Sequence, residues 1–183
     1  MRKILFENAS DRFTVSDTFE STMLLPIIKN LQDKAEHSWD DYDEVYHCMQ
    51  LIREAGERED IRMNFHTFHR NGACLGILLI SEGAIGGLPY FKDRLEEDLT
   101  DGAVVLNYFH ICPEGRGVGS RWVQDILMPY LRGQGFRRIL VKSSHPKAFS
   151  LYERLGRQIG TYTTRSDTGR FEREGRIYEL PVE

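Results

Sequence analysis

A glycine-rich stretch in the second half of the chain carries residue types suited to binding an anion. It runs from Ile111 to Ser120 as Ile-Cys-Pro-Glu-Gly-Arg-Gly-Val-Gly-Ser, between an apolar run and an amphipathic segment. Glycine permits positive φ and has no Cβ to keep a ligand away from backbone N–H groups. A helix start adds unpaired N–H donors and the positive end of the helix dipole. The pattern therefore predicts a phosphate-binding loop at the start of a helix.

This loop does not match the nucleotide-binding templates of dehydrogenases or of P-loop enzymes. A G-x-G-x-x-G fingerprint that began at Gly115 would need a glycine where Ser120 stands. The Gly-Lys-Ser/Thr ending of a P-loop is absent as well. Neither hydride transfer nor phosphoryl transfer is supported.

A second group of residues with chemical potential follows the next predicted strand. Ala148, Tyr152 and Gly156 recur at four-residue intervals on a predicted helix that begins near Pro146. On its own, a tyrosine at helical spacing is typical of a core aromatic. Without a motif around Tyr152, the core interpretation would be the better one.

Together the two stretches resemble the signatures of the GNAT family of N-acetyltransferases. The family's loop pattern, Gln/Arg-x-x-Gly-x-Gly/Ala, is matched by Glu114-x-x-Gly117-x-Gly119. Its helix pattern, Asn-x-x-Ala-x-x-x-Tyr-x-x-x-Gly, is matched from Ala148 onward, with His145 in place of the asparagine. The resemblance is specific over about residues 103–160 and topological elsewhere.

The resemblance implies one acyl-CoA N-acyltransferase domain over residues 1–183. The implied fold is an α/β protein with three layers, α/β/α, around a mixed, centrally splayed sheet of about 6–7 strands. The implied reaction moves acetyl from acetyl-CoA to a primary amine of a small molecule or peptide by direct attack. An acyl-CoA-binding sensor or regulatory module of the same fold is the alternative.

The family's roles can be carried onto this sequence by position. Ile111 lies on the strand expected to pair with the pantetheine arm of the cofactor, and the loop donates backbone hydrogen bonds to the pyrophosphate. Because Glu114 would repel phosphates unless it points away, Arg116 is expected to supply the positive contact. The remaining implied cofactor contacts are Cys112, Gly115, Gly117, Val118, Gly119, Ser120, His145, Phe149 and Tyr152.

Tyr152 is implied to be the general acid that protonates the departing CoA thiolate, because a tetrahedral intermediate collapses more readily when the sulfur gains a proton. The base that deprotonates the amine is left open. His110, just before the loop, has a side chain suited to that role near neutral pH, although a histidine on an apolar strand is more often a core residue. Asn107 cannot act as a base, and Glu82 could do so through a water molecule.

The hydrophobic periodicity predicts the elements that must position these residues. An Asn71-Gly72 pair between two β-rich runs predicts a hairpin, and a capping pattern at Ser16 or Asp17 predicts a helix start. Pro26 predicts a kink or break in that helix. The predicted strands are 61–69, 73–82, 103–112, 137–142, 157–165 and 176–182, together with either 4–6 or 12–15. The predicted helices are 16–31, 40–55, 122–131 and 146–155. An insertion at 84–101 is predicted to contain a short surface helix at 91–99.

Composition bounds the class of protein. Hydrophobic residues make up 40% and charged residues 28%, which suits a globular domain with a sizeable core. No apolar window reaches the length of a membrane span, and the start of the chain turns acidic before a signal-peptide core could form. Three dispersed cysteines without a CxxC pair favour a reduced compartment and no zinc site, so we expect a cytoplasmic protein without a metal.

Charge is distributed unevenly along the chain. Residues 1–113 carry 11 Lys and Arg against 20 Asp and Glu, whereas residues 114–183 carry 13 against 8. The basic part begins at the glycine loop, which favours an anionic ligand there. Nucleic-acid binding is not expected, because the whole chain is acidic and the basic and aromatic residues follow core periodicity. Membrane association is not expected, and a homodimer stays open.

Overall fold

The protein is built on one eight-stranded mixed sheet, with strand order β1-β2-β3-β4-β5-β6-β8-β7. The computed structural model describes residues 1–37, 41–84 and 101–182. In the sheet, β5 and β6 are parallel and every other neighbouring pair is antiparallel. The strands are β1 Arg2–Glu7, β2 Asp11–Ser16, β3 Ile61–Arg70, β4 Ala73–Gly83, β5 Ala103–Ile111, β6 Arg138–Ser143, β7 Arg157–Arg165 and β8 Glu172–Pro181. The count exceeds the predicted 6–7 because both N-terminal β-prone segments pair.

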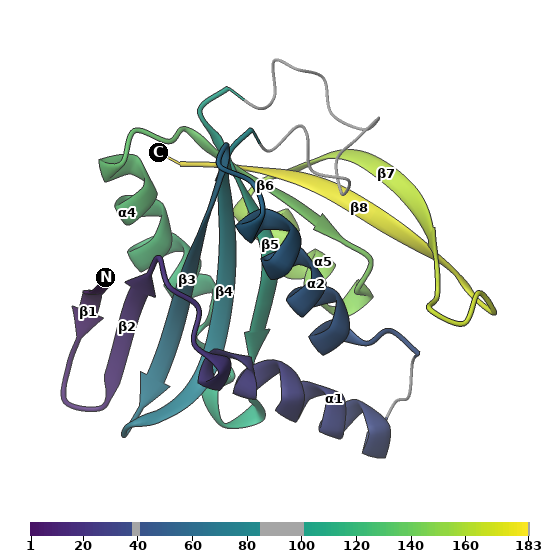
Figure 1. Cartoon of the computed structure of the whole chain (residues 1–183), viewed down its shortest axis with the longest axis horizontal. Coiled ribbons are helices and arrows are strands. Elements are labelled where there is room, and N and C mark those ends of the chain that lie inside the picture. Colours follow the sequence, from purple (N-terminus) through teal and green to yellow (C-terminus); the bar gives the residue numbers. More distant parts are fainter. Residues whose placement is uncertain (38–40, 85–100, 183) are drawn as a thin grey trace.

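Helices cover both faces of this sheet (Figure 1). One buried cluster joins α1 and α2 to one face, and a second joins η5, α4 and α5 to the other. The three-layer α/β/α arrangement predicted from the sequence is therefore confirmed. The helical elements are η1 Ser21–Leu24, α1 Leu25–His37, α2 Glu44–Gly56, η4 Pro113–Gly115, α3 Gly119–Arg121, η5 Trp122–Leu127, α4 Met128–Gly133 and α5 Pro146–Leu155.

Turn and breaker residues mark several boundaries as predicted. Asn71 and Gly72 both have positive φ, 50° and 82°, in the turn between β3 and β4, as a two-residue hairpin of this type requires. The break at Pro26 is confirmed, because the 3₁₀ turn η1 ends and α1 starts beside it. The predicted helix start at Ser16 or Asp17 is wrong. Strand β2 runs through Ser16, where pairing with β3 takes precedence over the local capping pattern.

The segment after the glycine loop forms one continuous helical rod made of α3, η5 and α4. Its middle part, η5, has π-helical geometry. Pro129 lies two residues after the end of η5, and its missing N–H removes one i→i−4 hydrogen bond, which accounts for a wider turn. Trp122 on this rod is fully buried against the sheet. The rod thus fixes the loop at its N-terminal end to the main core.

The remaining sequence predictions concern the insertion at 84–101 and membrane-spanning segments. The predicted surface helix at 91–99 lies outside the described residues. Among the described residues, no helix is long and apolar enough to cross a membrane.

Candidate active site

The two central parallel strands separate halfway along their length. β5 and β6 pair only where residues 103–106 meet residues 138–141, whereas β5 continues beside β4 as far as Ile111. A cleft of about 1220 Å³ opens where they part, with further walls from α1, α2, α5 and β8. The predicted splayed sheet is confirmed, and the splay brings the ends of both strands into the walls of one cleft.

A β-bulge at Asn107 decides which way the side chains of β5 point within this cleft. The residues on either side of Asn107 pair with two consecutive residues of β4, so Asn107 has no partner residue there. Such an extra residue reverses the alternation of side chains beyond it. Tyr108 therefore packs toward α1 and α2 and stacks on His110, with ring centroids 6.1 Å apart. Phe109 and Ile111 pack against the opposite core.

The glycine loop lies at one end of the cleft. Gly117 has a φ of +92°, which a residue with a side chain rarely adopts, and helix α3 begins two residues later at Gly119. Arg116, Gly117, Gly119 and Ser120 all line the cleft. The loop therefore presents the start of a helix and its backbone donors to whatever occupies the cleft.

Three of the predicted cofactor contacts lie beneath this loop instead. Cys112, Gly115 and Val118 are buried, and none of them lines the cleft. A Cβ on Gly115 would come within 2.9 Å of the Ile111 side chain and 3.1 Å of Phe68. Gly115 is thus required for close packing under the loop, while the ligand-facing positions are the next residues along.

Charge at the loop end of the cleft is positive. Glu114 does not line the cleft, and its carboxylate pairs with Lys29 of α1 at 3.5 Å. Arg116, Lys147 and Arg154 do line it, and none of the three makes an ion pair among the described residues. Glu114, the loop residue that departs from the family pattern, therefore points away from the cleft. Arg116, Lys147 and Arg154 remain available to contact a bound phosphate.

Helix α5 supplies the other wall, with His145, Phe149 and Tyr152 all lining the cleft. Only 5% of Tyr152 is exposed, and its ring lies 5.4 Å from that of Tyr178. Its hydroxyl makes no hydrogen bond to the described residues. Burial, followed by the nearby Tyr178, raises the pKa of Tyr152 well above its usual value. The hydroxyl consequently stays protonated at neutral pH and can donate.

His110 faces the same cleft from β5, on the side of α1 and α2. Burial, and then electrostatic interactions with His145 and Lys34, lower the pKa of His110 to about 4. At neutral pH the imidazole is therefore uncharged and can accept a proton, although its basicity is reduced.

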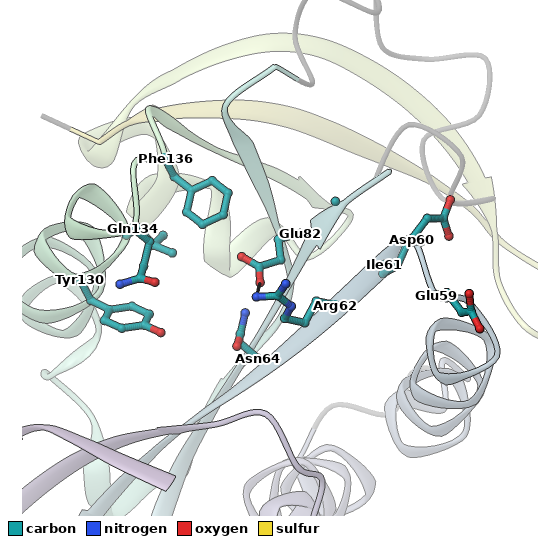
Figure 2. Close-up of a pocket in the computed structure, with 11 residues that line it drawn as sticks. Glu59, Asp60, Ile61, Arg62, Asn64, Glu82, Tyr130, Gln134 and Phe136 are labelled. Atoms are coloured by element: carbon teal, nitrogen blue, oxygen red, sulfur yellow. Dashed lines mark ion pairs between the residues drawn. The ribbon is translucent and has the colours of Figure 1, made fainter. Parts of the chain in front are cut away.

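Glu82 lies elsewhere, in a separate pocket of about 370 Å³ between the β3–β4 hairpin and α4 (Figure 2). There it pairs with Arg62 at 3.2 Å and faces the side chains of Tyr130 and Gln134. Glu82 is not among the residues that line the cleft. Asn107 lines the cleft, and its amide nitrogen donates to Ser81 Oγ at 2.6 Å.

The far end of the cleft contains residues that the sequence did not single out. Lys34 of α1 and Glu44 of α2 form a buried ion pair at 2.8 Å. The Tyr42 hydroxyl lies 3.5 Å from that of Tyr108, and Arg173 of β8 faces the same space. Glu44 lies in the first turn of α2, where a carboxylate also complements the helix dipole. Only the tertiary contacts reveal that Glu44 points into the cleft.

Comparison with known proteins gives structural likeness and no sequence match. No protein-family model matches the sequence, and no curated protein does. An N-acetyltransferase from Staphylococcus aureus Mu50 superposes with a TM-score of 0.55 at 14% identity, covering 93% of this chain and 99% of that chain.

Two further solved structures extend the likeness. A GNAT-superfamily phosphinothricin acetyltransferase from Sinorhizobium meliloti, in complex with AcCoA, gives 0.52 at 16% identity over 92% of this chain and 88% of that one. A ribosomal-protein-alanine N-acetyltransferase from Brucella melitensis gives 0.54 at 13% identity over 91% and 98%. At 13–16% sequence identity, this structural likeness shows a shared fold. The chain has the fold of the GNAT acetyltransferases, as its two sequence motifs predicted.

Proposed function

We propose that this protein is an N-acetyltransferase that transfers acetyl from acetyl-CoA to a primary amine of a small molecule or peptide. The observation that carries the proposal is one cleft that combines a glycine loop at a helix start with a protonated tyrosine on α5. A solved structure of the same fold is a complex with AcCoA.

The charge of the cleft supports an anionic substrate of this kind. Its lining includes seven Lys and Arg against three Glu, although the whole chain has a net charge of −4. Arg116, Lys147 and Arg154, which form no ion pair with the described residues, lie on the loop and α5, where the pyrophosphate and the phosphate monoester of CoA would be held. Backbone N–H groups at Gly117 to Ser120 would donate to the pyrophosphate.

The proposed reaction is a direct attack without a covalent enzyme intermediate. The neutral amine nitrogen forms a bond to the thioester carbon, and the carbon–sulfur bond then breaks. Tyr152 donates a hydrogen bond and then its proton to the departing sulfur. Before the attack, the ammonium gives one proton to solvent or to His110, which is uncharged at neutral pH. After the C–N bond forms, the nitrogen loses its second proton, and solvent returns a proton to the Tyr152 oxygen.

The test is release of the CoA thiol from acetyl-CoA, followed with a thiol reagent across a panel of primary amines. We expect release that needs both the protein and an amine, together with an N-acetylated product in the mass spectrum. Acetyl-CoA binding without turnover across the panel would instead favour an acyl-CoA sensor.

A further inference from the structure

The turn between β7 and β8 is fastened to the segment that leads into α2. Asp167 of the turn accepts hydrogen bonds from the backbone N–H of Asp43 and from Nε2 of His47, both at 2.8 Å. Asp41 accepts from the backbone N–H of Thr168 at 3.0 Å and pairs with Arg173 at 3.1 Å. We call these contacts, between residues 41–47 and residues 167–173, the hairpin latch.

The latch joins two opposite walls of the cleft. Tyr42 and Glu44 line the cleft from the side of α2, and Glu172, Arg173 and Glu174 line it from β8. In Figure 1 the β7–β8 hairpin extends to the same side of the molecule as the segment that leads into α2. Because these contacts tie the two walls together, they bridge this end of the cleft, which we call the closed end.

The closed end is the one left for the acetyl acceptor. The glycine loop and the cations Arg116, Lys147 and Arg154, which have no ion-pair partner in the described part of the chain, mark the opposite end as the phosphate end. At the closed end the cations are compensated: Lys34 pairs with Glu44 at 2.8 Å, and Arg173 pairs with Asp41. An acceptor there meets hydroxyl groups, aromatic rings and charges that form ion pairs, including Glu172 with Arg165 and Glu174 with Arg176.

From this arrangement, and resting on the proposed transfer reaction, we infer that the acceptor is a small polar amine that fits entirely beneath the hairpin latch. A peptide presents its terminal amine with the rest of its chain attached, and that chain must leave the cleft past the residues that the latch holds together. The latch therefore selects free small amines over peptide N-termini by excluding the larger molecule.

The experiment compares matched pairs of acceptors, amino acid amides and the tetrapeptides that begin with the same residues, in the thiol-release assay. We expect the wild-type protein to prefer the small amine by about tenfold or more in kcat/KM. The double variant Asp41→Ala/Asp167→Ala, which removes both anchors of the latch, should lose most of that preference. Asp125→Ala is the matched control, since Asp125 is an exposed carboxylate on η5 without an ion pair among the described residues.

A second measurement follows the latch without using activity. Arg170 lies exposed in the latched turn, so trypsin should cut after Arg170 faster in the double variant than in the wild type or in Asp125→Ala. Equal cutting rates in all three proteins would overturn the latch. Wild-type turnover of tetrapeptides as fast as of the small amines would overturn this inference alone, whereas no turnover of either class would overturn the transfer reaction itself.

Discussion

Replacing Tyr152 with phenylalanine separates the proposed chemistry from packing. The ring is 95% buried and packs near Tyr178, and phenylalanine retains all of those ring contacts. The hydroxyl that is removed makes no hydrogen bond to the described residues, so the free energy of unfolding should change by less than about 0.5 kcal/mol. Urea unfolding should therefore give the wild-type midpoint.

Turnover should respond very differently from stability. Loss of a positioned general acid typically lowers the rate by about 10²–10⁴-fold, and we expect a fall in kcat within that range for Tyr152→Phe. Affinity for acetyl-CoA, measured by calorimetry, should stay within about twofold, because the proposed contact strengthens only as the sulfur departs.

Tyr178→Phe is the matched control for this experiment. Tyr178 is a fully buried tyrosine beside Tyr152, and it does not line the cleft. Its variant should keep wild-type turnover. Unchanged kcat in Tyr152→Phe, or an equal loss in both variants, would refute the assignment of Tyr152 as the acid.

Three further predictions concern the loop and two histidines. Gly117→Ala should destabilise the loop conformation by about 1–2 kcal/mol because φ is +92° there, and calorimetry should show weaker acetyl-CoA binding. Gly133→Ala is the control: its φ lies outside the positive range and the space around it is open, so acetyl-CoA binding should not change. Burial lowers the pKa of His66 to about 3. The unfolded chain therefore binds a proton there first as pH falls below about 6.5. His66 alone should lower the free energy of unfolding by about 2 kcal/mol between pH 7 and pH 5, so in urea unfolding His66→Leu should lose about 2 kcal/mol less than the wild type over this range. If His110 is the base, its pKa of about 4 predicts that kcat/KM holds from pH 7 to pH 5 and falls near pH 4; a fall near pH 6.5 would contradict that role.

The parts of the fold that sequence could predict are those set by local chemistry. Asn71-Gly72 fixed a hairpin because few residues accept positive φ, and Pro26 marked a helix boundary because it cannot donate a hydrogen bond. The capping pattern at Asp17 failed for a different reason. Its competitor was pairing between β2 and β3, a contact between segments about 50 residues apart that no local pattern contains.

The same division applies to the candidate site. The glycine loop and Tyr152 lie on contiguous motifs, so their spacing alone could be compared with a known family. The far end of the cleft is assembled from residues distant in sequence, such as Asp41 and Arg173, which are 132 positions apart. The bulge at Asn107 contains no glycine, so the sequence gives no signal for it. It nevertheless determines that Tyr108 and His110 face this end of the cleft.

A crystal structure with acetyl-CoA would test the central claim most directly. The account predicts that the pyrophosphate lies against the backbone N–H groups of Gly117 and Gly119, with Arg116 nearby. It also predicts that the thioester sulfur lies within hydrogen-bonding distance of the Tyr152 hydroxyl, between the separated ends of β5 and β6. Acetyl-CoA bound outside this cleft, or with its sulfur remote from Tyr152, would contradict the account.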